Sequence, residues 1–476
     1  MTSKFLVFCI LALAISGSLA RYSDIRQKQF DIYRNQQILQ KLKETVEDPT
    51  SEFHHSAYKR LAYLVDTYGS RLWGSQSLEL AIQDLAKQIQ EDGIDVRLEP
   101  VKNFTKWVRG QESLTLFEPR PFPQKLKMIG LGRSVGGNVT ADAVVVTSFD
   151  DLQAKAHLVP GKIVIYSVPW VDYETTVAYR GSGAIEAAKL GAVAALVRSI
   201  TPFSIESPHT GSMSYAANVT QIPAAAIAVE DAEMFLRMYE RGQRIRLNLY
   251  MESWNVPNTN SFNVIAELRG SVYPEKILVL GGHTDSWDVG SQTGANDDGG
   301  GFVTCYEALR LIAKSGLTPK RTIRFIAWSG EEYGGALSGA SQYARDHKDE
   351  MDNHVVAFES DLGSRTPVAW GFSGGQNGFN YFQDLVSTYF KPIYNITEVL
   401  NGEGEMVDSG YIGDYGVPMV RNIGQDTPTN DYYFTFHHSA GDSMSVMDPE
   451  QMDENVVGIA SLFYLLADAD VALPRD

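Results

Sequence analysis

Cysteine is almost absent from this chain of 476 residues, which contains only Cys9 and Cys305. Cys9 lies in an apolar stretch that resembles a cleavable leader, so the mature chain would keep a single thiol. A single thiol excludes an internal disulfide, even in an oxidising compartment. Cys305 falls within a predicted amphipathic helix, which favours buried packing over nucleophilic chemistry. The fold must therefore rest on its hydrophobic core.

Positive charge is also scarce. The chain has 41 Lys and Arg against 58 Asp and Glu, giving a formal net charge of −17. A protein that binds nucleic acid needs a basic surface to neutralise phosphates, so this function class is excluded. The acidic surplus indicates solubility. The length suits one large domain with a smaller one, and the composition is that of a globular protein.

Long hydrophobic runs are missing after the N-terminus, where a bilayer span would need ~18 apolar residues. Residues 1–20 combine Lys4, an apolar stretch and a small-residue end at Ala20. This pattern predicts a secretory signal peptide, hence an extracellular or lysosomal protein without a membrane span. In that compartment four Asn-x-Ser/Thr triplets become candidate glycosylation sites. They are Asn103, Asn138, Asn218 and Asn395.

Residues 21–49 are polar and compatible with either a frayed helix or a removable pro-segment. From Ala57 onward helical spacing begins, and apolar residues at spacings of four, three and four predict a helix over 78–89. Residues 94–98 alternate as a half-buried strand does. The stretch 116–249 has its own predicted strands, at 143–147, 162–166, 193–197 and 222–229, but no residues spaced for a metal. We therefore predict an inserted domain there, between a main domain of 50–115 and 250–476.

The main domain alternates strands and helices. Residues 276–280, 322–328 and 355–358 are mostly apolar runs, typical of strands buried on both faces. A helix is predicted at 302–313, and Asp448 with Pro449 marks the start of a C-terminal helix. The expected fold class is α/β, with a mostly parallel central sheet covered by helices on both faces.

Chemistry-bearing side chains follow the ends of these predicted strands, where α/β sheets bind their ligands. His283 and Asp285 follow the first strand, Glu331 and Glu332 the second, and Asp361 the third. Two further pairs stand in loops: Asp297-Asp298 before the helix at 302–313, and His437-His438 with Asp442 near the C-terminus. Two zinc ions ~3.5–4 Å apart require imidazole and carboxylate ligands, a bridging carboxylate and a free base. The set supplies all of these.

The ordered set resembles the co-catalytic zinc exopeptidases, a family that includes bacterial aminopeptidases and glutamate carboxypeptidases. The resemblance covers nearly all of the mature chain and is carried by Gly-His-Thr-Asp-Ser-Trp-Asp-Val-Gly, Asn-Asp-Asp-Gly-Gly-Gly and Phe-His-His-Ser-Ala-Gly-Asp. It implies the zinc exopeptidase fold, with residues 116–249 similar to the protease-associated domain. It also implies two zinc ions per chain and a homodimer formed through the peptidase domain.

The resemblance assigns roles to single residues. His283 and Asp361 would hold one zinc, Glu332 and His438 the other, with Asp297 bridging both. Glu331 would be the general base, and Asp285 would orient His283. The adjacent pairs leave a choice: Asp297 is preferred because Gly301 and Glu307 then fall at the family's spacing. His438 is preferred because a serine follows it and Asp442 lies four residues later.

The function predicted from this resemblance is hydrolysis of short peptides by a carboxypeptidase or dipeptidase. An aminopeptidase would use the same metals and base, so the sequence leaves that alternative open. Two other relatives share the fold: non-hydrolytic binding proteins, which lack metal ligands, and one-zinc enzymes that cyclise N-terminal glutamine. The complete ligand set argues against both.

Overall fold

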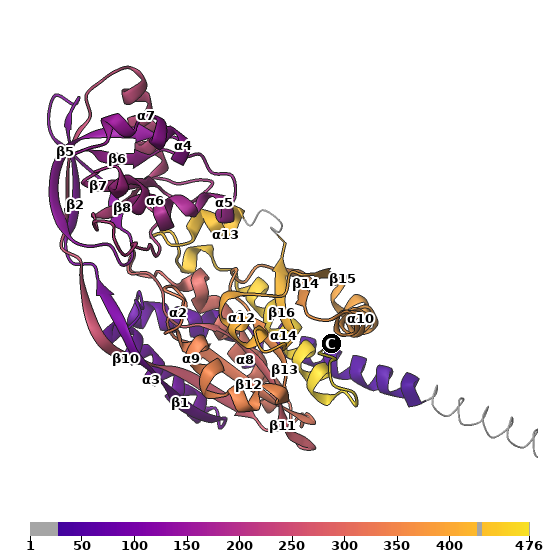
Figure 1. Ribbon diagram of the computed structural model, residues 1–476. Coiled ribbons are helices and arrows are strands. Elements are labelled where there is room, and N and C mark those ends of the chain that lie inside the picture. The colour runs from indigo at the N-terminus through magenta and orange to yellow at the C-terminus, as the bar shows by residue number, and fades with distance from the viewer. Residues whose placement is uncertain (1–26, 426–430, 476) are drawn as a thin grey trace, which may run out of the picture.

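The computed structural model describes residues 27–425 and 431–475, and two eight-stranded sheets organise them (Figure 1). The central four strands of the first sheet, β12, β11, β13 and β16, run parallel. Antiparallel pairs join β1, β10 and β14 to the sheet, and β15 pairs with β14 in parallel at the edge. The predicted parallel sheet is thus the centre of a mixed one. In spatial order its strands are β1 (Asp95–Val108), β10 (Trp254–Leu268), β12 (Arg321–Trp328), β11 (Tyr273–His283), β13 (His354–Glu359), β16 (Met419–Gly424), β14 (Pro367–Ser373) and β15 (Glu398–Asn401).

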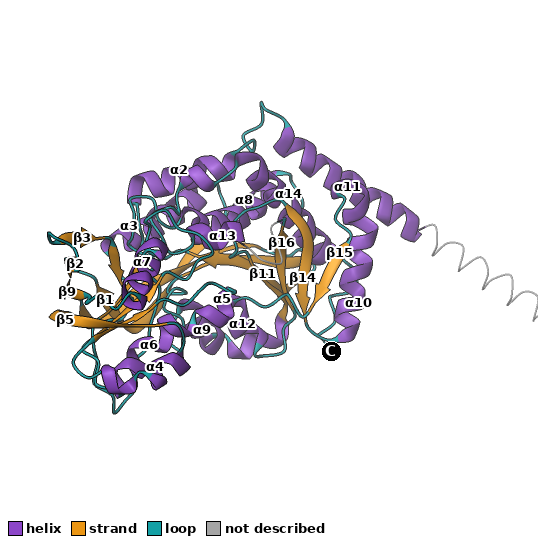
Figure 2. Ribbon diagram, turned by 90° about the horizontal axis from the view of Figure 1, so that it is seen from above, coloured by secondary structure: helices purple, strands orange, loops and turns teal. Residues whose placement is uncertain are grey.

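Helices cover both faces of this sheet (Figure 2). On one face lie α2 (Ser56–Tyr68), α3 (Gln76–Glu91), α8 (Gly300–Lys314) and α14 (Pro449–Asp468), and on the other α9 (Gly339–Asp346) and α12 (Val407–Gly413). The side chains of β11 alternate between the two layers: Leu278 and Leu280 join the cluster with α8, whereas Ile277 and Val279 pack with α9. This is why the strand reads as an unbroken apolar run.

The helices predicted from capping residues and apolar periodicity are present in the structure. Ser75 accepts a hydrogen bond from the backbone N–H of Leu78 at the start of α3, and Asp448 caps α14 from the position before Pro449. Three shorter helices complete this half: α10 (Gln376–Leu385), α11 (Lys391–Tyr394) and α13 (Asp431–Phe436).

A helix at 27–47 begins the described part of the chain, and Leu39, Leu42 and Val46 on it are buried in the main core. The predicted signal peptide, residues 1–20, lies outside the described residues. The pro-segment reading of residues 21–49 stays a prediction. Removal of these residues would expose the part of the core that Leu39, Leu42 and Val46 contact.

The second sheet is built from residues 112–251 and has its own hydrophobic clusters. Its strands, in spatial order, are β3 (Gln124–Leu126), β2 (Glu112–Glu118), β9 (Arg246–Met251), β5 (Gly137–Val146), β6 (Ile163–Tyr166), β7 (Ala194–Arg198), β8 (Ala224–Ile227) and β4 (Met128–Gly130). Its helices are α4 (Phe149–Ala154), α5 (Tyr173–Thr176), α6 (Ala178–Lys189) and α7 (Val229–Glu240). The strand predicted over 222–229 is shorter and spans Ala224–Ile227, because α7 begins at Val229. The strand predicted at 143–147 is the end of a longer one, β5.

Within the described residues, no helix is both long and apolar enough to cross a membrane.

Candidate metal centre

The predicted site residues meet at the carboxyl edge of the parallel strands. His283 is the last residue of β11, Glu331 and Glu332 follow β12, and Asp361 follows β13. Because β11, β12 and β13 are parallel neighbours, their ends deliver these side chains to one place. Asp297 joins them from the turn before α8, and His438 from the segment after α13.

Asp297 lies between two imidazoles. Its Oδ1 is 3.3 Å from Nε2 of His283, and its Oδ2 is 3.3 Å from Nε2 of His438. Each imidazole also faces a second carboxylate: Asp361 Oδ1 lies 3.3 Å from His283 Nε2, and Glu332 Oε2 lies 2.9 Å from His438 Nε2. Ligands held ~2.0 Å from a tetrahedral zinc are separated by about 3.3 Å, so these spacings match two neighbouring zinc spheres that share Asp297.

Several polar atoms here have no hydrogen-bond partner although they are buried: Nε2 of His283, Oδ2 of Asp297 and Oδ1 of Asp361. Buried polar atoms are normally satisfied, so each orphan calls for a partner such as a cation. The crowding of buried carboxylates also indicates a bound cation. Burial, reinforced by neighbouring carboxylates such as Asp297, raises the pKa of Glu332 well above its ordinary value, although nearby His283 opposes the rise. Metal ions would relieve this repulsion between carboxylates, and the residues therefore fit a metal centre.

Glu331 differs from the carboxylates around it. Its side chain is 14% exposed, against 9% for Asp361 and 3% for Glu332. Its Oε2 lies 3.7 Å from His283 Nε2, farther than the carboxylates that flank the imidazoles. Burial, and next the Asp361 and Asp297 carboxylates, raise the pKa of Glu331 well above its ordinary value, although His283 opposes them. Glu331 thus stands at the open side of the cluster, where a base must stand to meet substrate.

Asp298 and Asp285 act on the main chain. Asp298 accepts hydrogen bonds from the backbone N–H groups of His283, at 3.1 Å, and Gly301, at 3.1 Å. The carboxylate of Asp285 accepts from the N–H groups of Gly330 and Glu331. His283 Nδ1 lies 2.9 Å from the main-chain carbonyl of Asp285 but 3.7 Å from its carboxylate. His283 is therefore oriented by that carbonyl, and the Asp285 carboxylate fixes the Glu331 loop.

His437 faces the cluster together with His438. Its Nε2 lies 3.5 Å from Asp297 Oδ2, and the two imidazole rings are stacked with centroids 3.5 Å apart. Burial lowers the pKa of His437 to about 4, so its ring is neutral near pH 7. His437 faces one carboxylate of the cluster, whereas His438 faces both Asp297 and Glu332. The geometry favours His438 as the ligand and places His437 against the same bridging carboxylate.

Arg71 and Asp442 hold the loops that carry these side chains. Arg71 is fully buried, and its guanidinium donates to the carbonyls of Thr284 and Gly294, each at 2.8 Å. Asp442 accepts from the N–H groups of Gly294 and Asn296. Burial lowers the pKa of Arg71 to about 10, and Asp442 is the largest influence opposing that shift. Arg71 was not predicted from the sequence, since its partners lie 213 and 223 positions later.

We expect Arg71→Met to weaken zinc binding about 10–100-fold, the usual effect of removing groups that position metal ligands. The carbonyls of Thr284 and Gly294 would lose their donor inside the core, lowering the free energy of unfolding by about 1–3 kcal/mol. Competition with a chromogenic chelator measures the affinity, and urea unfolding the stability. Arg345→Met, which changes an exposed arginine on α9, is the control. Equal zinc affinity in both variants would contradict the role given to Arg71.

Residues of the 112–251 part also reach the centre. The main chain of Thr210 pairs with His438: its N–H donates to the His438 carbonyl at 3.0 Å, and its carbonyl lies 3.2 Å from His438 Nδ1. His209 Nδ1 lies 2.6 Å from the His437 carbonyl. Tyr173 of α5 stacks on Phe434 of α13 and meets the edge of His437, where the two parts adjoin (Figure 1). The loop between β7 and β8 thus fixes both histidines, a contribution that no spacing in the sequence indicates.

Known proteins resemble this chain in sequence and in fold. A profile of peptidase family M28 matches residues 263–462. Human carboxypeptidase Q is 46% identical over 423 residues, covering 88% of this chain and 87% of that protein. The crystal structure of a peptidase M28 precursor from Shewanella amazonensis superposes with a TM-score of 0.85 at 30% identity, covering 93% of this chain and 99% of that one. A zinc aminopeptidase from Bacillus subtilis shares the fold, with a TM-score of 0.64 at 20% identity over 86% of this chain and 93% of that one.

The fold and these similarities define a peptidase of the zinc exopeptidase class, and the chain belongs to peptidase family M28. Within that family it is similar to carboxypeptidase Q over most of its length, in human, mouse and frog alike. The predicted family and enzyme class, a zinc metallopeptidase, are confirmed, and a non-hydrolytic binding protein is not supported.

Proposed function

We propose that this enzyme is a two-zinc exopeptidase that hydrolyses short peptides as a carboxypeptidase or dipeptidase. The observation that supports two ions is the position of Asp297, whose two oxygens each face a different imidazole at 3.3 Å. The carboxypeptidase assignment rests on similarity to the carboxypeptidase Q proteins, which extends over 87–88% of their length.

The ligands follow from the pairs around Asp297. His283 and Asp361 would hold one zinc, and His438 and Glu332 the other, with Asp297 contributing one oxygen to each. The hydrogen bonds from His283 Nδ1 to the Asp285 carbonyl and from His438 Nδ1 to the Thr210 carbonyl would keep both Nε2 atoms free for metal.

Zinc ions bound there would polarise the scissile carbonyl and lower the pKa of the attacking water toward ~7. The protein's part is to move the proton. Glu331 would take it from the attacking water and pass it to the departing amine. The N–H of Glu331 donates to Asp285, so the position of the base is fixed by the segment that follows β11. Glu332 cannot share this work, because it stays ionised as a ligand.

Metal analysis and a panel of dipeptides with free, amino-blocked and carboxyl-blocked ends test this proposal. We expect two zinc ions at the Asp297 centre of each chain, loss of activity with a chelator, recovery with zinc, and cleavage only where the carboxyl terminus is free. Cleavage that tolerates a blocked carboxyl end but not a blocked amine would make the enzyme an aminopeptidase. No cleavage by the zinc-loaded protein would refute the proposal.

We further propose that the enzyme is secreted, glycosylated and dimeric, with 116–249 as an inserted protease-associated domain. Asn103, Asn138, Asn218 and Asn395 are all exposed, as glycan acceptors must be. The dimer rests on the family resemblance. Glycosidase digestion of the protein exported by cells, followed by sedimentation, tests the proposal: an unchanged mass and a monomeric sedimentation value would contradict it.

A further inference from the structure

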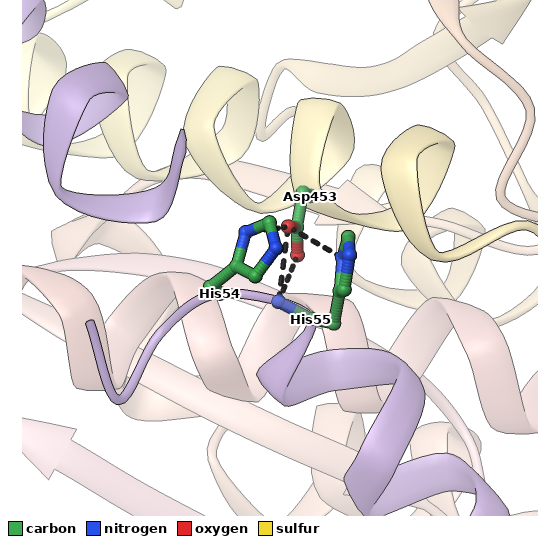
Figure 3. Close-up of side chains that lie close together, drawn as sticks. All are labelled: His54, His55 and Asp453. Carbon is green, nitrogen blue, oxygen red and sulfur yellow. Dashed lines mark hydrogen bonds and ion pairs between the residues drawn. The ribbon is translucent and has the colours of Figure 1, made fainter. Parts of the chain in front are cut away.

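A second group of metal-ligating side chains lies away from the Asp297 centre. His54 and His55 occupy the turn between the helix at 27–47 and α2, and Asp453 stands on α14 (Figure 3). The three come from opposite ends of the chain, with 398 positions between His55 and Asp453. The catalytic proposal uses none of them.

One oxygen of Asp453 is the focus of the group. Its Oδ2 lies 3.0 Å from His55 Nδ1 and 3.7 Å from His54 Nδ1, and the two imidazole centroids are 3.7 Å apart. Ligand atoms around a tetrahedral zinc are about 3.3 Å apart, so these two separations bracket the expected value. The His55 separation falls within the 2.9–3.3 Å range found between paired side chains of the Asp297 centre.

The carboxylates around His55 suit a metal at one of its ring nitrogens. A neutral imidazole carries one N–H. His55 nevertheless faces a carboxylate at each nitrogen: Asp453 at Nδ1, and Glu450 Oε1 at Nε2, 3.5 Å away. A metal on Nδ1 would leave the proton on Nε2, directed at Glu450, which is the arrangement that orients metal-bound histidines generally.

The surroundings suit a bound ion. The Asp453 side chain is 7% exposed, and the backbone N–H of His55 holds both of its oxygens. The histidine side chains are 20% and 23% exposed, which leaves access for water as a further ligand. A cavity of about 530 Å³ opens beside Asp453, and its wall carries Glu47, Glu450 and Glu454 together with Lys43 and Lys391. The carboxylates outnumber the lysines and favour a cation.

We propose that His54, His55 and Asp453 bind a zinc ion through His54 Nδ1, His55 Nδ1 and Asp453 Oδ2, with water completing the coordination. Two imidazoles and a carboxylate are ligands that zinc accepts, whereas magnesium prefers oxygen alone. Binding replaces the 3.1 Å hydrogen bond between His54 Nδ1 and the Val46 carbonyl. The ion would strengthen the link between the turn before α2 and α14, which hydrogen bonds from His55 to Asp453 already make. This proposal does not depend on the catalytic one.

The test is zinc content after equilibrium dialysis of the full-length protein against buffered zinc. We expect the double variant His54→Gln/His55→Gln to carry one zinc fewer per chain than the wild type and to keep its peptidase activity. Asp453→Asn should lose the same ion. The control is His347→Gln, since His347 also meets a carboxylate at each nitrogen, Glu99 and Glu350, but belongs to no such group. Its zinc content should equal that of the wild type.

A companion measurement separates this site from the Asp297 centre. In the background His283→Ala/His438→Ala, zinc should still raise the melting temperature, and adding His54→Gln/His55→Gln should abolish that rise, while magnesium has no effect in either protein. Equal zinc content in the wild type and in His54→Gln/His55→Gln would overturn the proposal and leave the three residues as a hydrogen-bonded contact. Failure of the catalytic proposal would appear instead as absent peptide cleavage with this zinc difference intact.

Discussion

Glu331→Gln is expected to lower kcat for dipeptide hydrolysis by about 10²–10⁴-fold, the range that a positioned general base supplies. Glutamine keeps the size and polarity of the side chain but cannot accept a proton from water near neutral pH. Glu331 is the most exposed carboxylate of the cluster and the one least engaged with the imidazoles, so zinc content should stay at the wild-type level. Stopped assays with the variant and metal analysis of the same sample check both halves of the prediction.

Two controls make this result specific. Glu332→Gln changes the neighbouring carboxylate, whose Oε2 lies 2.9 Å from His438 Nε2, and should lose zinc together with activity. Glu398→Gln changes an exposed residue at the start of β15 and should alter neither. A Glu331→Gln enzyme within threefold of the wild-type rate would remove Glu331 from the role of base. Loss of zinc from that variant would instead make it a ligand.

Strands with a mostly apolar pattern were predictable, because burial on both faces favours apolar residues at most positions. β11, β12 and β13 are of this kind, and their ends place His283, Glu331 and Asp361. β14 and β16 were not predicted. β16 contains Arg421 and Asn422, which interrupt its apolar pattern in the sequence. Their hydrogen-bond partners, Glu403 and Asn455, lie outside the sheet and reach them only in the folded chain.

The candidate centre was predictable in its residues but not in its supports. The carboxylates and imidazoles follow recognisable glycine-rich motifs, which is a local signal. Arg71 and Thr210 carry no such signal, since their partners lie more than two hundred positions away. Arg71 donates to the carbonyls of Thr284 and Gly294, and the Thr210 carbonyl faces the His438 imidazole. The choice between Asp297 and Asp298 was also beyond local pattern. In the folded chain, Asp298 bonds to backbone N–H groups while Asp297 faces the imidazoles.

Asp297→Asn is expected to reduce zinc content by at least one ion per chain and to lower kcat by about 10³-fold or more. The reason is that each proposed zinc takes one oxygen of this carboxylate, whereas an amide offers one oxygen and no charge. Asp298→Asn is the matched comparison. It should keep its zinc but lower the free energy of unfolding by about 1–3 kcal/mol, because an amide can accept only one of the N–H groups of His283 and Gly301 well. Metal analysis and urea unfolding of both variants provide the two readouts.

The contrast between these adjacent residues tests the centre more sharply than either variant alone. Both side chains are buried, at 4% and 0% exposure, so a general effect of burying an amide would change the two proteins alike. A zinc loss confined to Asp297→Asn would mean that its position between His283 and His438 matters, and not its acidity as such. The reverse pattern, with zinc lost from Asp298→Asn alone, would move the bridge by one residue. Full zinc content in both variants would rule out a shared carboxylate, and the two imidazoles would then belong to independent metal sites.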